Sequence, residues 1–155
     1  MKPVVFSGSF DPVTNGHLDL IKRARTLFGA VRVVVFNNAC KQTRFTAQER
    51  VCLLQQALAG EENITVDSFD GLLTDYMKKH GLTTVVRGLR SAHDWNHERT
   101  QSHFNKHFYP EIETVFLPSD EKFIFISSSA VKEAASCGAD ITGLVPPCVA
   151  DKLKI

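Results

Sequence analysis

The segment from Ser7 to His17 combines glycines, hydroxyl groups and a histidine in an order that suits anion binding. It follows a short apolar run and leads into a stretch of helical period. Gly8 and Gly16 would let the backbone approach a ligand closely, and the free N–H groups of a helix start attract anions. His17 stands at that start, where its ring could donate to a phosphate oxygen. The segment predicts a phosphate-binding loop, although a lone histidine at a helix start is more often structural or solvated.

Further candidate phosphate ligands lie at two later points of the chain. Arg87 and Arg90 flank Gly88-Leu89 directly after an apolar run, and the serines of Ser127–Ser129 precede another helical stretch. Guanidinium groups and helix N-termini both bind phosphate, so these segments predict a site for a polyanion. Surface ion pairs for the arginines, and a simple helix cap for the serines, are the structural alternatives.

The most familiar nucleotide and metal motifs are absent. No two of the nine glycines are separated by a single residue, which excludes the G-x-G-x-x-G fingerprint, and no Walker-A lysine follows a suitable glycine pair. The pairs His93/His97 and His103/His107 have the i, i+4 spacing of metal ligands, but no nearby cysteine supplies a third ligand. We expect these four histidines on a solvated helix surface.

Short apolar runs alternate with helical stretches along almost the whole chain, and this order must bring the candidate residues together. The expected strands are 3–7, 31–36, 64–68, 84–86 and 113–117. Helices are expected at 18–28, after a capping box at Thr46–Glu49, at 72–80, at 91–108, after Ser127 and at 148–153. This order predicts an α/β fold: a Rossmann-like, doubly wound, five-stranded parallel sheet with helices on both faces. Residues 1–155 are expected to form a single domain, with ligands beyond the carboxyl ends of the strands.

Composition limits the classes of partner. The 155 residues are 43% hydrophobic and carry a net charge of +1, so no overall field attracts nucleic acid or an anionic membrane. No apolar stretch is long enough to span a bilayer, and the first residues do not resemble a signal peptide. Cys40, Cys52, Cys137 and Cys148 include no C-x-x-C pair, and we expect buried or half-buried free thiols. These features predict a soluble, cytoplasmic protein.

The glycine-rich loop resembles that of a known superfamily. Its pattern, G-S-F-D-P-V-T-N-G-H, is similar to the nucleotidyltransferases with a T/H-x-G-H tetrapeptide, here Thr14–His17. Further matches in register narrow the resemblance, over essentially the full length, to the bacterial phosphopantetheine adenylyltransferases. They are Lys41 with Phe45-Thr46 and Glu49-Arg50, Arg87–Arg90, Asp94-Trp95 with Glu98, and Phe125–Ser129 with Val131–Glu133. The chain departs from the family pattern at Ser7, Ser9 and Phe123.

This resemblance implies a reaction between two phosphorylated substrates. The phosphate of 4′-phosphopantetheine would attack the α-phosphorus of ATP in line, giving dephospho-coenzyme A and pyrophosphate without a covalent intermediate. The protein would align the two anions and spread the charge of the transition state. Mg²⁺ would be bound mainly through ATP phosphates and water, so no dedicated protein ligand for the metal is implied. The family also implies a homohexamer.

The resemblance also implies a role for each matching residue. Among the catalytic residues, His17 would stabilise the pentacoordinate α-phosphate, Lys41 would bridge the two phosphates, and Arg90 would hold the β- and γ-phosphates. The implied ATP-binding residues are Ser9, Phe10, His17, Gly88, Leu89, Arg90, Glu98, Phe123, Ile124, Phe125, Ile126, Ser127, Ser128 and Ser129. The implied phosphopantetheine-binding residues are Ser9, Lys41, Leu73, Arg87 and Glu133.

Two other functions stay open. A sister nucleotidyltransferase could act on nicotinate mononucleotide or a polyol phosphate, and a non-catalytic nucleotide-sensing module could retain the same fold. The second arginine and the segment from Asp94 to Glu98 argue against the sister enzyme, because they belong to the phosphopantetheine branch. The presence of His17 and Arg90 argues against the sensor.

Overall fold

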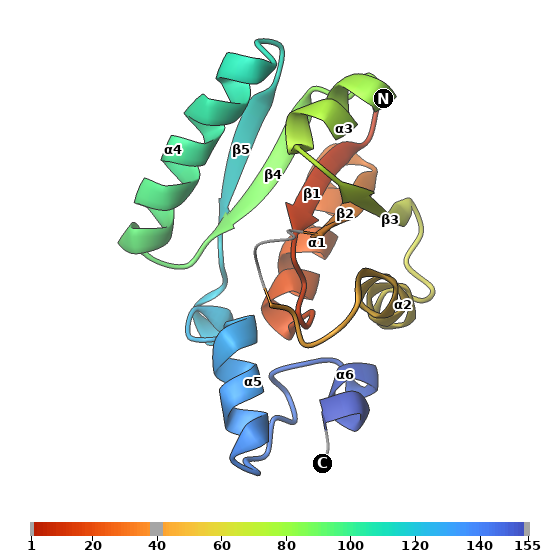
Figure 1. The fold of residues 1–155 in the computed structure, drawn as a ribbon, viewed down its shortest axis with the longest axis vertical. Helices are drawn as coiled ribbons and strands as arrows, with labels where there is room; N and C mark the ends of the chain where they lie inside the picture. Colours follow the sequence, from red (N-terminus) through yellow and green to blue (C-terminus); the bar gives the residue numbers. More distant parts are fainter. Residues whose placement is uncertain (1, 38–41, 154–155) are drawn as a thin grey trace.

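The computed structural model describes residues 2–37 and 42–153. Within them, five parallel strands form a sheet in the order β3-β2-β1-β4-β5 (Figure 1). The strands are β1 (Val4–Gly8), β2 (Val31–Asn37), β3 (Ile64–Asp70), β4 (Thr84–Leu89) and β5 (Glu113–Pro118). The strand order changes direction between β1 and β4, so the crevice at the carboxyl ends of these two strands is where such a sheet binds ligands.

Helices cover both faces of this sheet, because alternate strand residues point to opposite sides. Val4 and Phe6 of β1 face a core shared with α1 (Asn15–Phe28), α2 (Ala47–Ala57), α5 (Ser128–Ser136) and α6 (Pro147–Leu153). Val5, between them in sequence, faces a second core with α3 (Leu73–His80). The long helix α4 (Ala92–Phe108) packs on β4, β5 and α3. The predicted doubly wound α/β fold is confirmed.

The predicted strands and helices are all present, with boundaries shifted by a few residues. β3 and β4 continue past their predicted ends, to Asp70 and Leu89, because their pairing with β2 and β5 continues into polar residues. A short 3₁₀ helix, η1 (Glu121–Phe123), was not predicted. The one local feature that favours it is the N-terminal cap by Asp120, whose Oδ1 accepts a hydrogen bond from the N–H of Lys122 at 3.1 Å.

The cysteines differ in part from expectation. Cys52, Cys137 and Cys148 are free thiols, as predicted, but Cys52 and Cys137 are exposed and only Cys148 is partly buried. The expected burial was wrong for the first two because Cys52 lies on the solvent side of α2 and Cys137 caps the end of α5. Cys40 lies outside the described residues.

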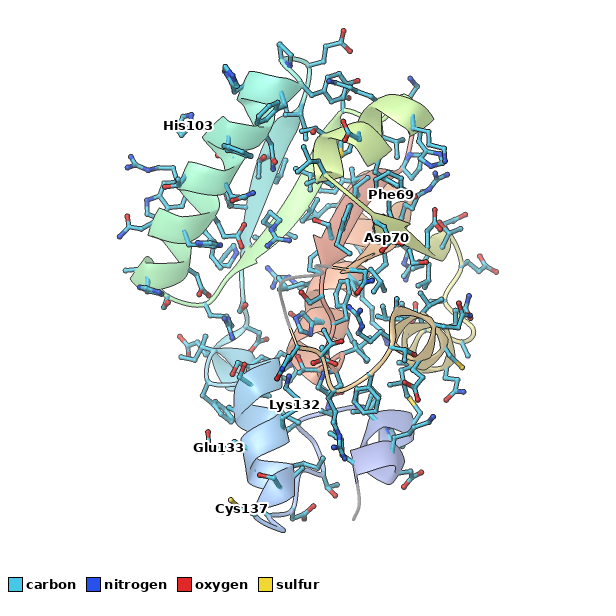
Figure 2. All side chains as sticks on the ribbon, in the orientation of Figure 1. Phe69, Asp70, His103, Lys132, Glu133 and Cys137 are labelled. Carbon is cyan, nitrogen blue, oxygen red and sulfur yellow. The ribbon has the colours of Figure 1, made fainter. Side chains whose placement is uncertain are left out.

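The surface of α4 carries the histidine pairs singled out by their spacing. His93, His97, His103 and His107 are all exposed, which confirms the expected placement on a solvated helix. Figure 2 shows His103 pointing away from the body of the protein. None of the helices in the described part of the chain is both long and apolar enough to cross a membrane.

Candidate active site

The start of α1 fixes the orientation of the His17 ring. Thr14 is the N-cap: its Oγ1 accepts from the N–H of His17 at 3.4 Å, and His17 Nδ1 accepts from the N–H of Thr14 at 3.1 Å. This reciprocal pair is a capping box in which histidine replaces the usual glutamate. Because Nδ1 accepts a backbone N–H, the neutral ring carries its proton on Nε2. His17 therefore offers an N–H donor at Nε2.

His17 is neutral near pH 7. Desolvation, followed by the positive charges of Arg90 and Arg87, lowers the pKa of His17 from 6.5 to about 4. The ring forms a T-shaped contact with Phe10, with 5.2 Å between ring centroids. The histidine can therefore donate a hydrogen bond to an anion, while the arginines supply the positive charge.

Arg90 lies just beyond the carboxyl end of β4 and links α4 to the segment before α5. Its Nε and its backbone N donate to Asp94 Oδ2 at 3.0 and 3.1 Å. Its Nη1 donates to the carbonyl of Ile126 at 3.1 Å. The bonds from Nε and Nη1 hold the guanidinium at the mouth of the crevice, with part of the group still accessible to a ligand.

Arg87, three residues earlier, is more tightly enclosed. Its Nε and Nη2 donate to the two carboxylate oxygens of Glu98 at 2.7 and 2.6 Å, and its Nη1 donates to the carbonyl and the hydroxyl of Ser7. Asp94 and Glu98 are one helical turn apart on α4, so one face of this helix holds both arginines. The arginines thus form ion pairs, as in the structural alternative, and also line a cavity.

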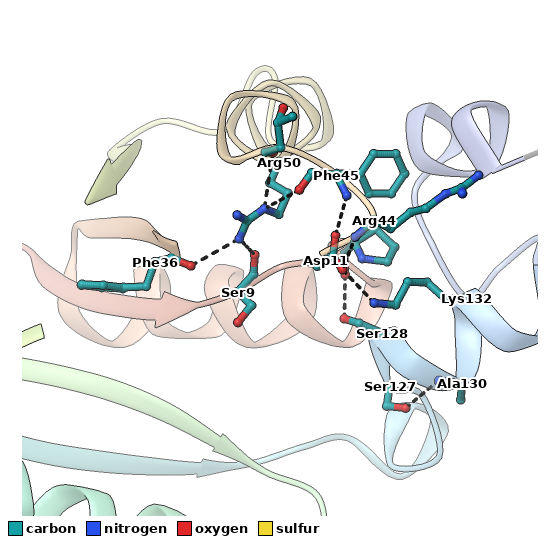
Figure 3. Close-up of polar contacts among 12 residues, drawn as sticks. Ser9, Asp11, Phe36, Arg44, Phe45, Arg50, Ser127, Ser128, Ala130 and Lys132 are labelled. Carbon is teal, nitrogen blue, oxygen red and sulfur yellow. Dashed lines mark hydrogen bonds and ion pairs between the residues drawn. The ribbon is translucent and has the colours of Figure 1, made fainter. Parts of the chain in front are cut away.

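The N-terminus of α5 lies beside the β1–α1 loop. Ser127 Oγ accepts from the N–H of Ala130 at 3.1 Å, which confirms the helix cap. Ser128 Oγ donates to the carbonyl of Pro12 at 2.7 Å, and this bond joins α5 to the loop after β1 (Figure 3). The serine-rich helix start and the loop after β1 therefore face the same space.

Asp11 ties a third segment to the same loop. Its buried carboxylate accepts the N–H groups of Arg44 and Phe45 at 2.9 Å each, and the ammonium of Lys132 at 2.7 Å (Figure 3). Burial alone would raise the pKa of Asp11, but the hydrogen bond from Lys132 and the two backbone donors hold it below the usual range. Asp11 is therefore an ionised junction between the loop, α5 and the chain before α2.

Two adjoining cavities open at the carboxyl edge of the sheet. The first, of about 310 Å³, is surrounded by the β1–α1 loop, the end of β4, α4 and the start of α5. The second, of about 740 Å³, extends toward Leu72, Leu73, Phe104 and Phe108. They share a wall formed by Ser7, Gly8, Ser9, Arg87 and Glu98.

Most of the predicted site residues lie in these cavities. The first is lined by Ser9, Phe10, His17, Arg87, Gly88, Arg90, Glu98, Phe123, Ile126, Ser127, Ser128 and Ser129. The second is lined by Ser9, Leu73, Arg87 and Glu98 among the predicted residues. Residues far apart in sequence are therefore brought together as the motifs suggested, while their individual roles stay predictions.

Four predicted residues do not line either cavity. Ile124 and Phe125 are 48% and 68% exposed, and Leu89, the last residue of β4, lies outside the lining of both cavities. Glu133 is exposed on α5, on a different side from its neighbour Lys132 (Figure 2). The structure therefore does not bring Glu133 to the cavity of Leu73 and Arg87. Lys41 lies outside the described residues.

The structure also brings in residues that carried no predicted role. Thr14, Leu20, Asp94 and Ser119 line the first cavity. The four-residue spacing of Asp94 and Glu98 was the available signal for a shared helix face. Gly88 has a packing reason as well, because a Cβ at this position would lie 2.3 Å from Leu20 Cδ1.

The residues of the site offer no ligand set for a metal ion. No group of three or more histidine, cysteine, aspartate and glutamate side chains in the described part of the chain could hold one. The carboxylates of the first cavity, Asp94 and Glu98, are each paired with an arginine.

Comparisons with known proteins agree with this geometry. A family model described as Cytidylyltransferase-like matches residues 5–134. The chain is 48% identical to the phosphopantetheine adenylyltransferase of Dictyoglomus turgidum, covering 99% of this chain and 96% of the relative. It is 46% identical to the enzymes of the same name from Dictyoglomus thermophilum and Shouchella clausii, covering 99% of this chain in each case and 93% and 97% of the relatives.

Proposed function

Because the chain belongs to the cytidylyltransferase-like family and, within it, to the phosphopantetheine adenylyltransferases, we propose that its site joins two phosphorylated substrates. It transfers the adenylyl group of ATP to 4′-phosphopantetheine, giving dephospho-coenzyme A and pyrophosphate, a step of coenzyme A biosynthesis. The observation that carries this proposal is the pair of cavities with a common wall at Ser7–Ser9, Arg87 and Glu98. Two ligands seated in them meet at that wall.

The contents of the two cavities differ in a way that matches the two substrates. The smaller cavity holds His17, Arg90 and the N-terminus of α5, which suits the triphosphate of ATP. The larger cavity has apolar side chains at its far end, including Leu73, Phe104 and Phe108, which suit an elongated and partly apolar arm. The acceptor phosphate would then lie at the shared wall, near the Ser9 hydroxyl and the Arg87 guanidinium.

The reaction needs alignment and charge stabilisation more than a side-chain base, since a phosphate nucleophile is already ionised near pH 7. Neutral His17 donates a hydrogen bond from Nε2–H to the α-phosphate oxygens as negative charge builds up on them in the transition state. Arg90 binds the leaving pyrophosphate, whose far end reaches the N–H groups at the start of α5. Lys41 bridges the two phosphates in this proposal, although it lies outside the described residues.

Glu98 has a second effect within this scheme. Its bidentate bond, together with the Ser7 carbonyl, occupies most of the Arg87 donors, so Arg87 lies behind the acceptor phosphate as half of an ion pair with few free N–H groups. The Ser7 hydroxyl accepts from the same guanidinium at 3.2 Å. Serine at this departure from the family pattern therefore adds an acceptor for Arg87.

Three further features belong to the proposal. Mg²⁺ enters as MgATP and is bound through the substrate phosphates, in keeping with the lack of a carboxylate cluster in the described residues. The homohexamer that the family implies is the expected assembly, and analytical ultracentrifugation would test it. A cytoplasmic location agrees with the free thiols of the described cysteines.

The deciding experiment measures pyrophosphate release from ATP and Mg²⁺ with alternative acceptors. We expect release with 4′-phosphopantetheine and none with nicotinate mononucleotide or a polyol phosphate. Release with one of the latter alone would instead assign the chain to a sister activity. ATP binding without release for any acceptor would indicate a nucleotide sensor.

A further inference from the structure

Arg50 is a fully buried arginine outside the residues already given a role. It lies on α2, directly after Glu49 of the capping box, and its exposed fraction is 0%. Burying a guanidinium is costly, and an apolar side chain of similar size would fill the same space at less cost. The position of this charge therefore calls for an explanation beyond packing.

The guanidinium of Arg50 joins three segments at the edge of the site. Its Nη1 donates to the carbonyl of Ser9 at 2.7 Å and to that of Phe36 at 3.3 Å (Figure 3). Its Nη2 donates to Asn37 Oδ1 at 3.2 Å, and its Nε donates to the carbonyl of Phe45 at 3.1 Å. One side chain thus connects the phosphate-binding loop, the carboxyl end of β2 and the segment before α2.

The loop that Arg50 holds is strained where it is held. Phe10, directly after Ser9, has a φ of 49°, a left-handed conformation that side chains other than glycine rarely adopt. Such a conformation persists only where neighbouring bonds enforce it. Arg50 binds the Ser9 carbonyl from one side, and the Ser9 hydroxyl points away from Arg50 on the other (Figure 3).

The charge of Arg50 is not neutralised by the groups that it contacts. Its acceptors are carbonyl oxygens and one side-chain amide, all of them uncharged. Desolvation lowers the pKa of Arg50, and the more distant charge of Asp11 opposes this shift. A guanidinium nevertheless stays protonated in proteins, so a net positive charge lies beneath the backbone of Ser9.

We propose that Arg50 is a positioning residue for the acceptor phosphate. It holds the strained Ser9–Phe10 turn in the conformation that presents the Ser9 hydroxyl, and it fixes this turn to the carboxyl end of β2. This inference rests on the proposed function, because the ligand at Ser9 is taken to be the phosphate of 4′-phosphopantetheine. Loss of Arg50 should weaken acceptor binding much more than ATP binding.

The test compares Arg50→Lys and Arg50→Met with the unaltered protein, by pyrophosphate release with each substrate varied in turn. Arg50→Lys keeps the positive charge but loses the planar set of N–H donors of the guanidinium. For this variant we expect KM for 4′-phosphopantetheine to rise at least about tenfold, the factor that corresponds to one lost hydrogen bond to a charged group. KM for ATP should change less than about twofold. Tyr76→Phe is the matched control: it removes a partly buried hydrogen bond to Asp67, between two residues that line neither cavity, and should leave both KM values unchanged.

A double-mutant cycle with Ser9→Ala separates positioning from general stability. If Arg50 acts through Ser9, removing the hydroxyl should raise the acceptor KM much less in the Arg50→Lys background than in the unaltered protein. Fully additive effects, or an equal rise of both KM values, would overturn the proposal. So would a failure of both Arg50 variants to fold while Tyr76→Phe folds, since Arg50 would then serve the fold alone. An inactive unaltered protein would instead count against the proposed function.

Discussion

The neutral state of His17 predicts a specific dependence of stability on pH. Burial and the two nearby arginines lower the pKa of His17 to about 4 in the folded protein, against 6.5 for an unperturbed histidine. As the pH falls below 6.5, the unfolded chain therefore takes up a proton that the folded protein does not. Stability due to this group is fully present above pH 6.5, falls between pH 6.5 and 4, and is fully lost below that range.

The size of the effect follows from these two pKa values. At pH 5 the unfolded state gains a factor of about 30 from protonation of this histidine, and the folded state gains almost nothing, which corresponds to about 2 kcal/mol. For a domain of this size, a change of about 2 kcal/mol moves the urea midpoint by roughly 1 M. The effect is large enough to measure against the other titrating groups.

The assay is urea unfolding at pH 7.5 and at pH 5, for the unaltered protein and for His17→Gln. Glutamine cannot titrate, so the difference between the two proteins isolates His17 from the carboxylates. We expect the stability advantage of histidine over glutamine to shrink by about 2 kcal/mol at the lower pH. An NMR titration of the His17 ring should have its midpoint near pH 4.

Two results would refute this reasoning. A ring titration near pH 6.5 would show that the enclosure by Arg87, Arg90 and the protein interior does not disfavour the imidazolium. A pH-independent difference between the unaltered protein and His17→Gln would show that protonation of His17 is not linked to folding. In either case His17 would be a cation over part of the physiological range, and the neutral Nε2 donor in the mechanism would have to be abandoned.

Three further changes test other parts of the site. His17→Ala should reduce kcat by orders of magnitude and the affinity for ATP much less, as steady-state rates and calorimetry would show; unchanged turnover would exclude the transition-state role. Gly88→Ala should destabilise the protein by about 1–3 kcal/mol, because the new Cβ would collide with Leu20 Cδ1. Thermal unfolding measures this loss of stability, and an unchanged midpoint would contradict the prediction. Lys132→Met should cost about 2 kcal/mol in urea unfolding by leaving the buried Asp11 carboxylate without its cation; equal stability would show that the backbone donors suffice.

Local signals in the sequence account for most of the elements and for the loop of the site. Strand and helix periods predicted the parallel sheet, because a buried strand is continuously apolar and an amphipathic helix repeats every three to four residues. The capping box at Thr46–Glu49 is present with both hydrogen bonds. These features depend on neighbours in sequence, so they can be seen without the fold.

The exposure of single side chains was harder to predict. The helical residues Glu133 and Lys132 are adjacent, yet Lys132 reaches the buried Asp11 and Glu133 faces solvent. Cys52 and Cys137 were expected to be buried and are exposed. Which side of a short helix faces the protein depends on how that helix is docked, and its own residues do not specify this.

The sequence by itself determined that a glycine-rich loop follows β1, that two arginines lie at the carboxyl end of β4, and that a serine-rich helix start comes later. Tertiary structure alone decided how these parts combine. It paired Arg87 with Glu98, and it placed the guanidinium of Arg50 against the carbonyl of Ser9, 41 residues away in sequence. Hydrogen bonds of this kind join residues that are far apart in the chain, so they produce no repeating pattern of residues in the sequence from which they could be predicted. Their geometry exists only once the sheet has brought the ends of β1, β2 and β4 to one edge.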